Sequence, residues 1–122
     1  MLRILIVEDG AIFRELLRTT LQSRFPSAEI SEVTNGKEAL ERMEALVPEF
    51  VFIDIRLPDA NGLELTALIK TKHPETKVVI LTNYDLPEYR EAASNYKADH
   101  FIPKDTFMEM INTIFFQGSH FE

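Results

Sequence analysis

Short apolar runs rich in Val, Ile and Phe alternate with longer segments of helical period along this 122-residue chain. The alternation is typical of repeated βα units, in which helices bury a parallel sheet on both faces. The pattern predicts strands at about 3–7, 29–33, 50–54, 77–82 and 100–102. It predicts helices at about 11–25, 37–46, 63–72, 88–96 and 106–116. The sequence therefore favours one α/β domain with a five-stranded parallel sheet.

Polar groups of complementary chemistry stand where four of these strands end. Glu8 and Asp9 follow the first strand, Asp54 ends the third, Thr82 ends the fourth and Lys104 follows the fifth. Because ligands of an open parallel sheet bind beyond the carboxyl ends of its strands, we expect these side chains to meet at one edge. Three carboxylates, a hydroxyl and an ammonium suit a divalent cation and a phosphoryl group better than they suit an apolar core.

The acidic residues form a candidate magnesium site. Mg²⁺ takes about six oxygen ligands in a tight octahedron and keeps several waters. We expect Asp9, Asp54, a water held by Glu8 and the backbone carbonyl of Arg56 to supply part of that shell. Crowded carboxylates raise one another's pKa, so a bound cation would relieve the strain.

Asp54 is also the candidate nucleophile for a phosphoryl group. Lys104 would offer its charge to one phosphoryl oxygen and Thr82 its hydroxyl to another. Taken singly, each of these residues has an ordinary role as a capping, strand or surface residue. Their occurrence together at one sheet edge favours a functional site. Clustered acids repel one another, and a surface without a function gains nothing from placing them together.

These residues resemble the receiver domain of two-component response regulators, from residue 4 to about residue 116. The acid pair, the phosphoacceptor segment, the hydroxyl segment and the lysine segment agree with that family in order and spacing, at residues 7–9, 52–62, 79–82 and 101–104. The resemblance implies a doubly wound, flavodoxin-like sheet of strand order 2-1-3-4-5. It places the receiver domain at 1–117 and a polar tail at 118–122.

The resemblance also implies a function. Asp54 would accept a phosphoryl group from a sensor histidine kinase or a phosphotransfer protein, with Mg²⁺ held by Glu8 and Asp9. Thr82 and the aromatic Phe101 would act as the switch, and the signal would leave through the fourth helix, fifth strand and fifth helix. Such a chain is a phosphoacceptor signalling domain rather than an enzyme.

The sequence departs from the family's pattern at several positions. Asn83 and Tyr84 follow Thr82, where the family prefers a small residue, so side chains could narrow access to Asp54. Because Arg56 and Tyr84 would flank the path of an attacking water, we expect slow loss of the phosphoryl group. Further along, residues 97 and 100 stand where the family commonly has glycine. The isomer of the peptide bond before Pro103 is undetermined by sequence.

Composition narrows the function classes. The net charge of −7 repels phosphate backbones, which disfavours direct DNA or RNA binding by this chain. The absence of cysteine excludes disulfides and cysteine–metal sites. The apolar runs are too short to span a bilayer, and the first meets Glu8 and Asp9 before a signal peptide could form. We therefore expect a cytoplasmic protein with no membrane contact.

Three alternatives stay open. An aspartyl-nucleophile phosphatase would carry a second acid two residues after the nucleophile, where this chain has Arg56. A flavin- or nucleotide-binding module would need a phosphate-cradling loop after the first strand, where Glu8 and Asp9 stand. A receiver-like interaction module could signal without phosphorylation.

The output of the chain is undetermined by its sequence. A stand-alone receiver and a piece of a longer regulator both fit, and the cognate kinase, the stimulus and the output partner stay open. Met108 and Phe115 fall partly outside the apolar stripe of the last helix, which favours a phosphorylation-dependent homodimer through the fourth and fifth helices.

Overall fold

The computed structural model describes residues 1–116, in which strands and helices alternate along the whole length. The strands are β1 (Arg3–Val7), β2 (Glu29–Val33), β3 (Phe50–Asp54), β4 (Lys77–Thr82) and β5 (His100–Pro103). The helices are α1 (Ala11–Arg24), α2 (Gly36–Leu46), α3 (Gly62–Lys72), α4 (Pro87–Asn95) and α5 (Phe107–Phe116), and a 3-10 turn, η1 (Lys104–Thr106), precedes the last. The tail predicted at 118–122 lies outside the described residues.

The five strands form one parallel sheet in the order β2-β1-β3-β4-β5. The predicted sheet and strand order are therefore confirmed. Val7 of β1 pairs with Ile53 of β3, and Asp54 pairs with Leu81 of β4. This register brings the carboxyl ends of the central strands to the same edge of the sheet, which is where ligands of such folds bind.

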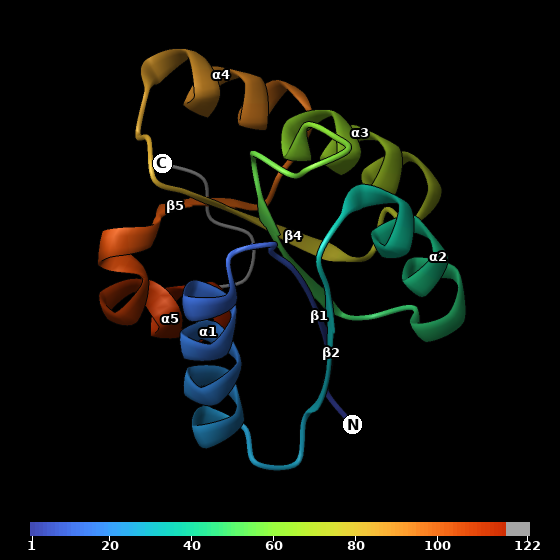
Figure 1. Ribbon diagram of the computed structural model, residues 1–122, viewed down its shortest axis with the longest axis vertical. Coiled ribbons are helices and arrows are strands. Elements are labelled where there is room, and N and C mark those ends of the chain that lie inside the picture. The colour runs from blue at the N-terminus through green and yellow to red at the C-terminus, as the bar shows by residue number, and fades with distance from the viewer. Residues whose placement is uncertain (117–122) are drawn as a thin grey trace.

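Helices cover both faces of the sheet (Figure 1). α1 and α5 pack on one face, and α2, α3 and α4 pack on the other. Because successive side chains of a strand point to opposite faces, each strand feeds two apolar layers. Ile4, Ile6 and Phe52 enter the α1–α5 layer, whereas Leu5 and Ile53 enter the layer under α2, α3 and α4.

Phenylalanines dominate the layer beneath α1 and α5. Phe115 packs against Phe25 and Phe50, each with ring centroids 4.4 Å apart. Phe52 and Phe107 meet edge to face at 6.2 Å, an arrangement that aromatic rings favour. Phe115 is only partly buried and packs against the margin of this layer, in agreement with the expectation that it falls partly outside the buried stripe.

Two Asn-Gly pairs start helices. The Asn35 side chain accepts a hydrogen bond from the Glu38 amide, and Asn61 accepts from the amides of Leu63 and Glu64. Asparagine is among the best N-cap residues, so each pair supplies a cap and the first helical residue. The helices predicted from residues 37 and 63 accordingly begin one residue earlier, at glycine.

The chain adopts a left-handed backbone just after two helices. Val47, which ends α2, has φ of 44°, and Lys97, beyond α4, has φ of 70°. Glycine is the usual residue in this region because it has no Cβ to clash. A glycine would adopt the left-handed geometry at Lys97 without strain.

The turn after β5 differs from expectation. Lys104 begins the 3-10 turn, and α5 starts at Phe107 rather than at Thr106. The peptide bond before Pro103 is trans, which settles its isomer.

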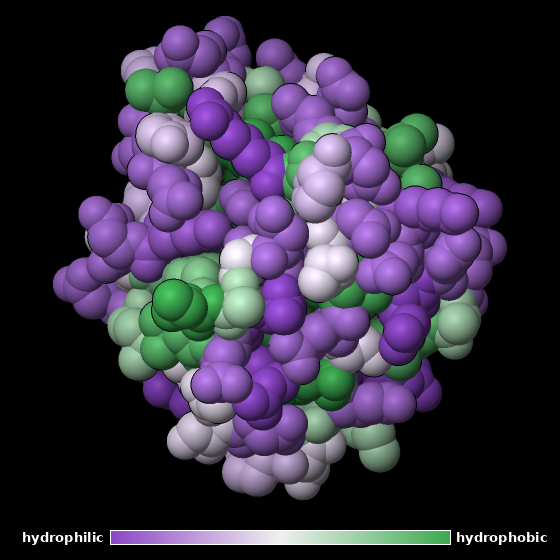
Figure 2. All heavy atoms as spheres, viewed as in Figure 1, coloured by the Kyte–Doolittle hydropathy of each residue, from purple (hydrophilic) through white to green (hydrophobic). Residues whose placement is uncertain are grey.

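The surface is mainly hydrophilic in the view of Figure 2, with separate apolar patches. Ile12 is 89% exposed and Leu16 is 46% exposed, both on α1. None of the helices in the described part of the chain is long and apolar enough to cross a membrane.

Candidate functional site

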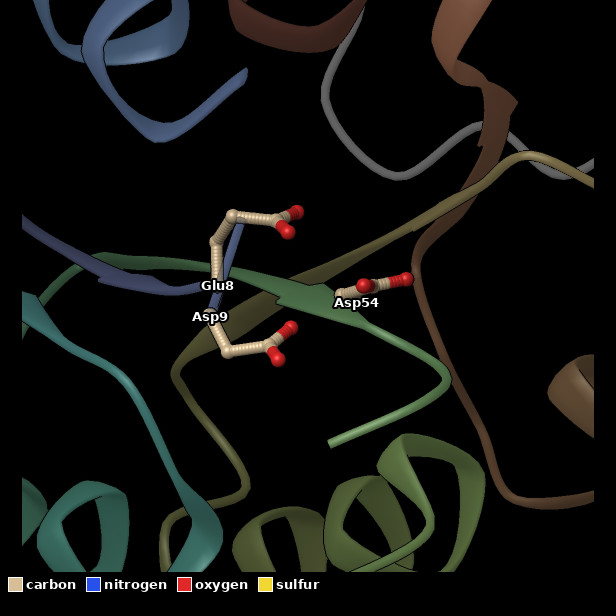
Figure 3. Close-up of side chains that lie close together, drawn as sticks. All are labelled: Glu8, Asp9 and Asp54. Atoms are coloured by element: carbon tan, nitrogen blue, oxygen red, sulfur yellow. The ribbon is translucent and has the colours of Figure 1, made fainter. Parts of the chain in front are cut away.

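The predicted acidic residues lie together at the carboxyl edge of the sheet (Figure 3). Glu8 and Asp9 follow β1, and Asp54 ends the adjacent strand β3. One carboxylate oxygen from each residue lies within 4.8 Å of the other two. Glu8 and Asp54 are buried, whereas Asp9 is exposed. The cluster therefore has two acids held in the protein and one at its mouth.

Lys104 brings a positive charge into this cluster. Its Nζ lies 2.9 Å from Glu8 Oε1 and 3.4 Å from Asp54 Oδ2. The Phe13 ring supports the ammonium from α1, with Nζ 4.7 Å from the ring centroid. An ammonium between two carboxylates reduces their mutual repulsion, and it also stands where a phosphoryl oxygen on Asp54 would need a cation.

Glu8 is the most perturbed acid of the site. Burial raises the pKa of its carboxyl above the ordinary value; the Lys104 ammonium opposes this shift, and the charge of Asp54 adds to it. Oε2 of the carboxylate accepts a hydrogen bond of 3.0 Å from the Gly10 amide. The Arg14 side chain donates to the Glu8 carbonyl, which anchors the chain between β1 and α1. Ionised Glu8 is therefore positioned but electrostatically strained.

Thr82 is buried at the end of β4, and its hydroxyl is engaged locally. Oγ1 accepts a hydrogen bond of 2.9 Å from the Tyr84 amide and donates one of 3.1 Å to the Tyr84 carbonyl. The side chain predicted to serve a phosphoryl group is thus held by the loop that leads to α4.

Phe101 of β5, the predicted partner of Thr82 in the switch, is only 7% exposed. It joins the apolar layer under α2, α3 and α4. The Arg90 guanidinium of α4 lies over its ring, with Cζ 4.6 Å from the centroid. The role of Arg90 is not predictable from the sequence, because no local pattern links a helix arginine to a strand aromatic eleven residues later.

The loop after Asp54 is held at both ends. Its Asp59 carboxylate accepts hydrogen bonds from the amides of Gly36 and Lys37, at 2.7 and 3.0 Å, and these bonds lower the pKa of Asp59. The Gly62 amide donates to the Ile55 carbonyl at 2.7 Å. A Cβ at Gly62 would clash with the Asp54 carbonyl oxygen, so this position needs glycine. The sequence alone does not reveal this constraint, because an Asn-Gly pair is typical of any turn.

Arg56 lies beside the site on the same loop. Its guanidinium stacks on Tyr84, with Cζ 4.5 Å from the ring centroid, and its Nη2 lies 3.5 Å from the Tyr89 hydroxyl. Tyr89 chiefly, with Asp54 as a lesser cause, raises the pKa of the guanidinium. The side chain thus connects the loop after β3 to the loop after β4 and to α4.

The residues present fit a hard divalent cation. Converging carboxylates are the ligands that Mg²⁺ prefers, and a pair of buried acids beside an exposed one leaves a side open for water. The electrostatic strain on Glu8 is of the kind that a cation relieves. The chemistry of the donor set therefore supports a magnesium site at the carboxyl edge.

The chain is similar to known proteins over most of its length. The family model described as the response regulator receiver domain matches residues 4–115. The transcriptional regulatory protein LnrK of Bacillus subtilis is 35% identical over 119 residues, which cover 93% of this chain and 54% of LnrK. The transcriptional regulatory protein YdfI of the same organism is 32% identical over 109 residues, which cover 89% of this chain and 51% of YdfI. The chain thus spans about half the length of these relatives.

A solved structure shows the same fold with a ligand. The response regulator TrrA of Thermotoga maritima, in complex with Mg²⁺ and BeF, superposes with a TM-score of 0.82 at 35% identity. The match covers 93% of this chain and 96% of that one.

Proposed function

Because the chain belongs to the response regulator receiver domain family, we propose that Asp54 is its phosphoacceptor and that phosphorylation of this side chain controls a partner or effector. The observation that carries the proposal is the position of Asp54. Its carboxylate lies within 4.8 Å of the other two acids and 3.4 Å from the Lys104 ammonium, at the carboxyl edge of the sheet. A carboxylate so placed has a nucleophilic oxygen and a cation beside it.

The chain's own residues have distinct roles in the proposed transfer. A carboxylate oxygen of Asp54 forms the new O–P bond as the P–N bond of a phosphohistidine breaks, and the imidazole leaves with its electron pair. Lys104 stabilises the charge on one phosphoryl oxygen. The Thr82 hydroxyl would donate to another after its bonds to Tyr84 break. Phe101 would complete the switch that these movements drive.

Glu8, Asp9 and Asp54 would hold Mg²⁺ together with the backbone carbonyl of Arg56. The bound ion would supply a Lewis acid that neutralises the acids and polarises the phosphoryl group. The phosphodonor is proposed to be a sensor histidine kinase or a phosphotransfer protein. A cytoplasmic location and the absence of direct nucleic acid binding by these residues stay parts of the proposal.

Mass spectrometry after incubation with acetyl phosphate and Mg²⁺ tests the phosphoacceptor. We expect one added phosphoryl group on the wild type and none on Asp54→Asn. The matched control is Asp105→Asn, which changes an exposed aspartate beyond the site and should still accept one group. EDTA should abolish the addition in the wild type and in the control.

The same experiment separates the alternatives. An unmodified wild type would favour an interaction module that signals without phosphorylation. Repeated turnover of a phosphomonoester would favour a phosphatase, although Arg56 occupies the position of that family's general acid. Loss of one phosphoryl group per chain by slow hydrolysis would support a phosphoacceptor that is not a turnover enzyme.

A further inference from the structure

The hydroxyl of Thr82 is fully used within its own loop. It accepts a hydrogen bond from the Tyr84 amide and donates its proton to the Tyr84 carbonyl. A hydroxyl has one proton to donate, so Thr82 cannot also donate to a group on Asp54 until the second bond breaks. The geometry of residues 83–86, which we call the β4–α4 loop, is therefore tied to the orientation of Thr82.

The same loop holds an arginine of the next helix. Asp85 Oδ1 accepts a bond of 3.0 Å from Nη2 of Arg90, which lies in α4. The ion pair joins the loop to the helix side chain directly. A displacement of the β4–α4 loop would move Asp85 and so change the position of Arg90.

Arg90 in turn covers the aromatic residue of β5. Its guanidinium lies over the Phe101 ring at 4.6 Å, and the ring is 7% exposed. A pocket of about 310 Å³ opens beside this contact and is lined by Arg90, Phe101, Pro103 and Met110 among others. Arg90 therefore contacts both the loop that positions Thr82 and the face formed by α4, β5 and α5.

We propose that Arg90 is a latch that holds the site in its unphosphorylated conformation. The ion pair with Asp85 and the stacking on Phe101 stabilise the β4–α4 loop while the Thr82 hydroxyl is bonded to Tyr84. When the hydroxyl turns to a phosphoryl group on Asp54, the loop moves, the ion pair opens and the guanidinium leaves the ring. The inference rests on the proposed function and names the residues that regulate that site.

The latch should weaken the binding of a phosphoryl analogue, because binding is linked to the change of conformation. A ligand that binds only the conformation with Thr82 turned toward Asp54 must work against whatever stabilises the other conformation. A solvent-accessible ion pair together with a cation–π contact on a buried ring changes such an equilibrium by about fivefold. Removing the latch should therefore tighten the apparent binding of a phosphoryl analogue by about fivefold.

Calorimetric titration of the chain with beryllofluoride in the presence of Mg²⁺ tests this consequence. Arg90→Met keeps the side-chain stem and removes the charge, and it should bind about fivefold tighter than the wild type. Asp85→Asn removes only the ion pair and should bind about twofold tighter. The matched control is Arg24→Met, the same change at an exposed position in the last turn of α1, which should leave the affinity unchanged.

Amide hydrogen exchange supplies a second test that needs no ligand. The Tyr84 amide donates to Thr82 Oγ1, so loosening the loop should raise its exchange rate by about fivefold in Arg90→Met. The amide of Val79, within the core of β4, should keep its rate. A general loss of stability would instead raise both rates.

The outcomes separate the latch from the proposed function. No Mg²⁺-dependent binding by the wild type, or equal binding by Asp54→Asn, would overturn the proposed function and the latch with it. Binding by the wild type that is unchanged or weakened in Arg90→Met would overturn the latch alone. So would an unchanged Tyr84 exchange rate, or a gain in affinity that Arg24→Met reproduces.

Discussion

Glu8 shows how a single residue of the site sets the stability of the metal-free protein. Its pKa is raised in the folded state, mainly by burial, so the folded chain binds this proton more tightly than the unfolded chain does. The free energy of unfolding therefore falls as pH rises from the ordinary value of the carboxyl through its raised value. Below the pKa values of both the unfolded and the folded state, the carboxyl is neutral and burying it costs no charge desolvation.

We expect Glu8→Gln to be more stable than the wild type at pH 7 in EDTA, because it removes the buried charge. The difference should vanish near pH 3, well below the ordinary value of the carboxyl, where Glu8 is protonated in both states. Thermal unfolding followed by circular dichroism at the two pH values measures it. The control is Glu41→Gln on the exposed side of α2, expected within about 0.5 kcal/mol of the wild type. A Glu8→Gln protein less stable at pH 7 would contradict the role of burial.

We predict that Arg56 and Tyr84 control a second property, the lifetime of a phosphoryl group on Asp54. The guanidinium stacks on the Tyr84 ring and lies 3.5 Å from the Tyr89 hydroxyl, so these side chains connect the loops that follow β3 and β4. We expect the doubly substituted Arg56→Ala/Tyr84→Ala chain to hydrolyse its phosphoryl group several-fold faster, and about tenfold if roughly 1.4 kcal/mol of the barrier is lost. The decay of the phosphorylated mass over time measures the rate.

Arg42→Ala, on α2, is the matched control for that rate and should leave it unchanged. An unaltered half-life in the double variant would show that neither side chain limits access of water to Asp54.

At this scale the sequence predicted which residues meet but not how they are oriented. Glu8, Asp9, Asp54 and Lys104 were identifiable because each stands at a strand end, and parallel strands place such ends together. The bonds of Thr82 to Tyr84 were not predictable, since a buried hydroxyl has several partners within reach and only the folded loop selects one.

At the scale of the secondary-structure elements, the residues at helix ends affect the stability of the protein. Val47 is a β-branched residue at φ of 44°, a region in which such side chains clash with the backbone. Val47→Gly should raise the free energy of unfolding by about 0.5–1 kcal/mol, because relief of strain exceeds the entropy that glycine adds to the unfolded chain. Urea unfolding of the two proteins measures the change.

Ala45→Gly, in the last turn of the same helix, provides a control of opposite sign. That substitution should cost about 1 kcal/mol, since the position is helical and glycine is a poor helix former. A loss of stability in both variants would show that the left-handed geometry at Val47 is not strained.

Element types were predictable because apolar periodicity and polar breaks agree along the chain, whereas the first residues of helices were not. Asn35 and Asn61 look like turn residues in sequence, and only the capping geometry shows that the following glycines are already helical. The 3-10 turn at Lys104 was missed for a related reason. A 3-10 turn and an α-helix both place apolar residues three or four positions apart, so the sequence pattern does not distinguish the short 3-10 turn from the start of α5.

At the scale of the whole molecule, the structure offers a different apolar residue, Met110, as a contact for the predicted homodimer. Phe115 packs against Phe25 and Phe50. Met108 is 57% exposed, as the sequence predicts, but it lies beside α1, where its sulfur accepts from the Thr20 hydroxyl. Met110 instead borders the pocket between α4, β5 and α5 and is 37% exposed. If phosphorylation creates a dimer through this face, Met110 is the apolar contact that the structure offers.

Light scattering with and without beryllofluoride and Mg²⁺ measures the association. We expect the mass to double on addition of the analogue and to stay monomeric in Met110→Glu, which places a charge on the contact. Met108→Glu is the matched control and should still dimerise. A mass that the analogue does not change would remove the homodimer from the proposal.

The contact between Glu8 and Lys104 joins residues near opposite ends of the described chain. A polypeptide emerging from the ribosome exposes Glu8 well before Lys104, so β1 is made before its counter-charge exists. Folding during synthesis can thus assemble the first strands and helices but leaves their acids unneutralised. Synthesis of β5 and Lys104 is therefore the step that supplies the ammonium beside Glu8 and Asp54.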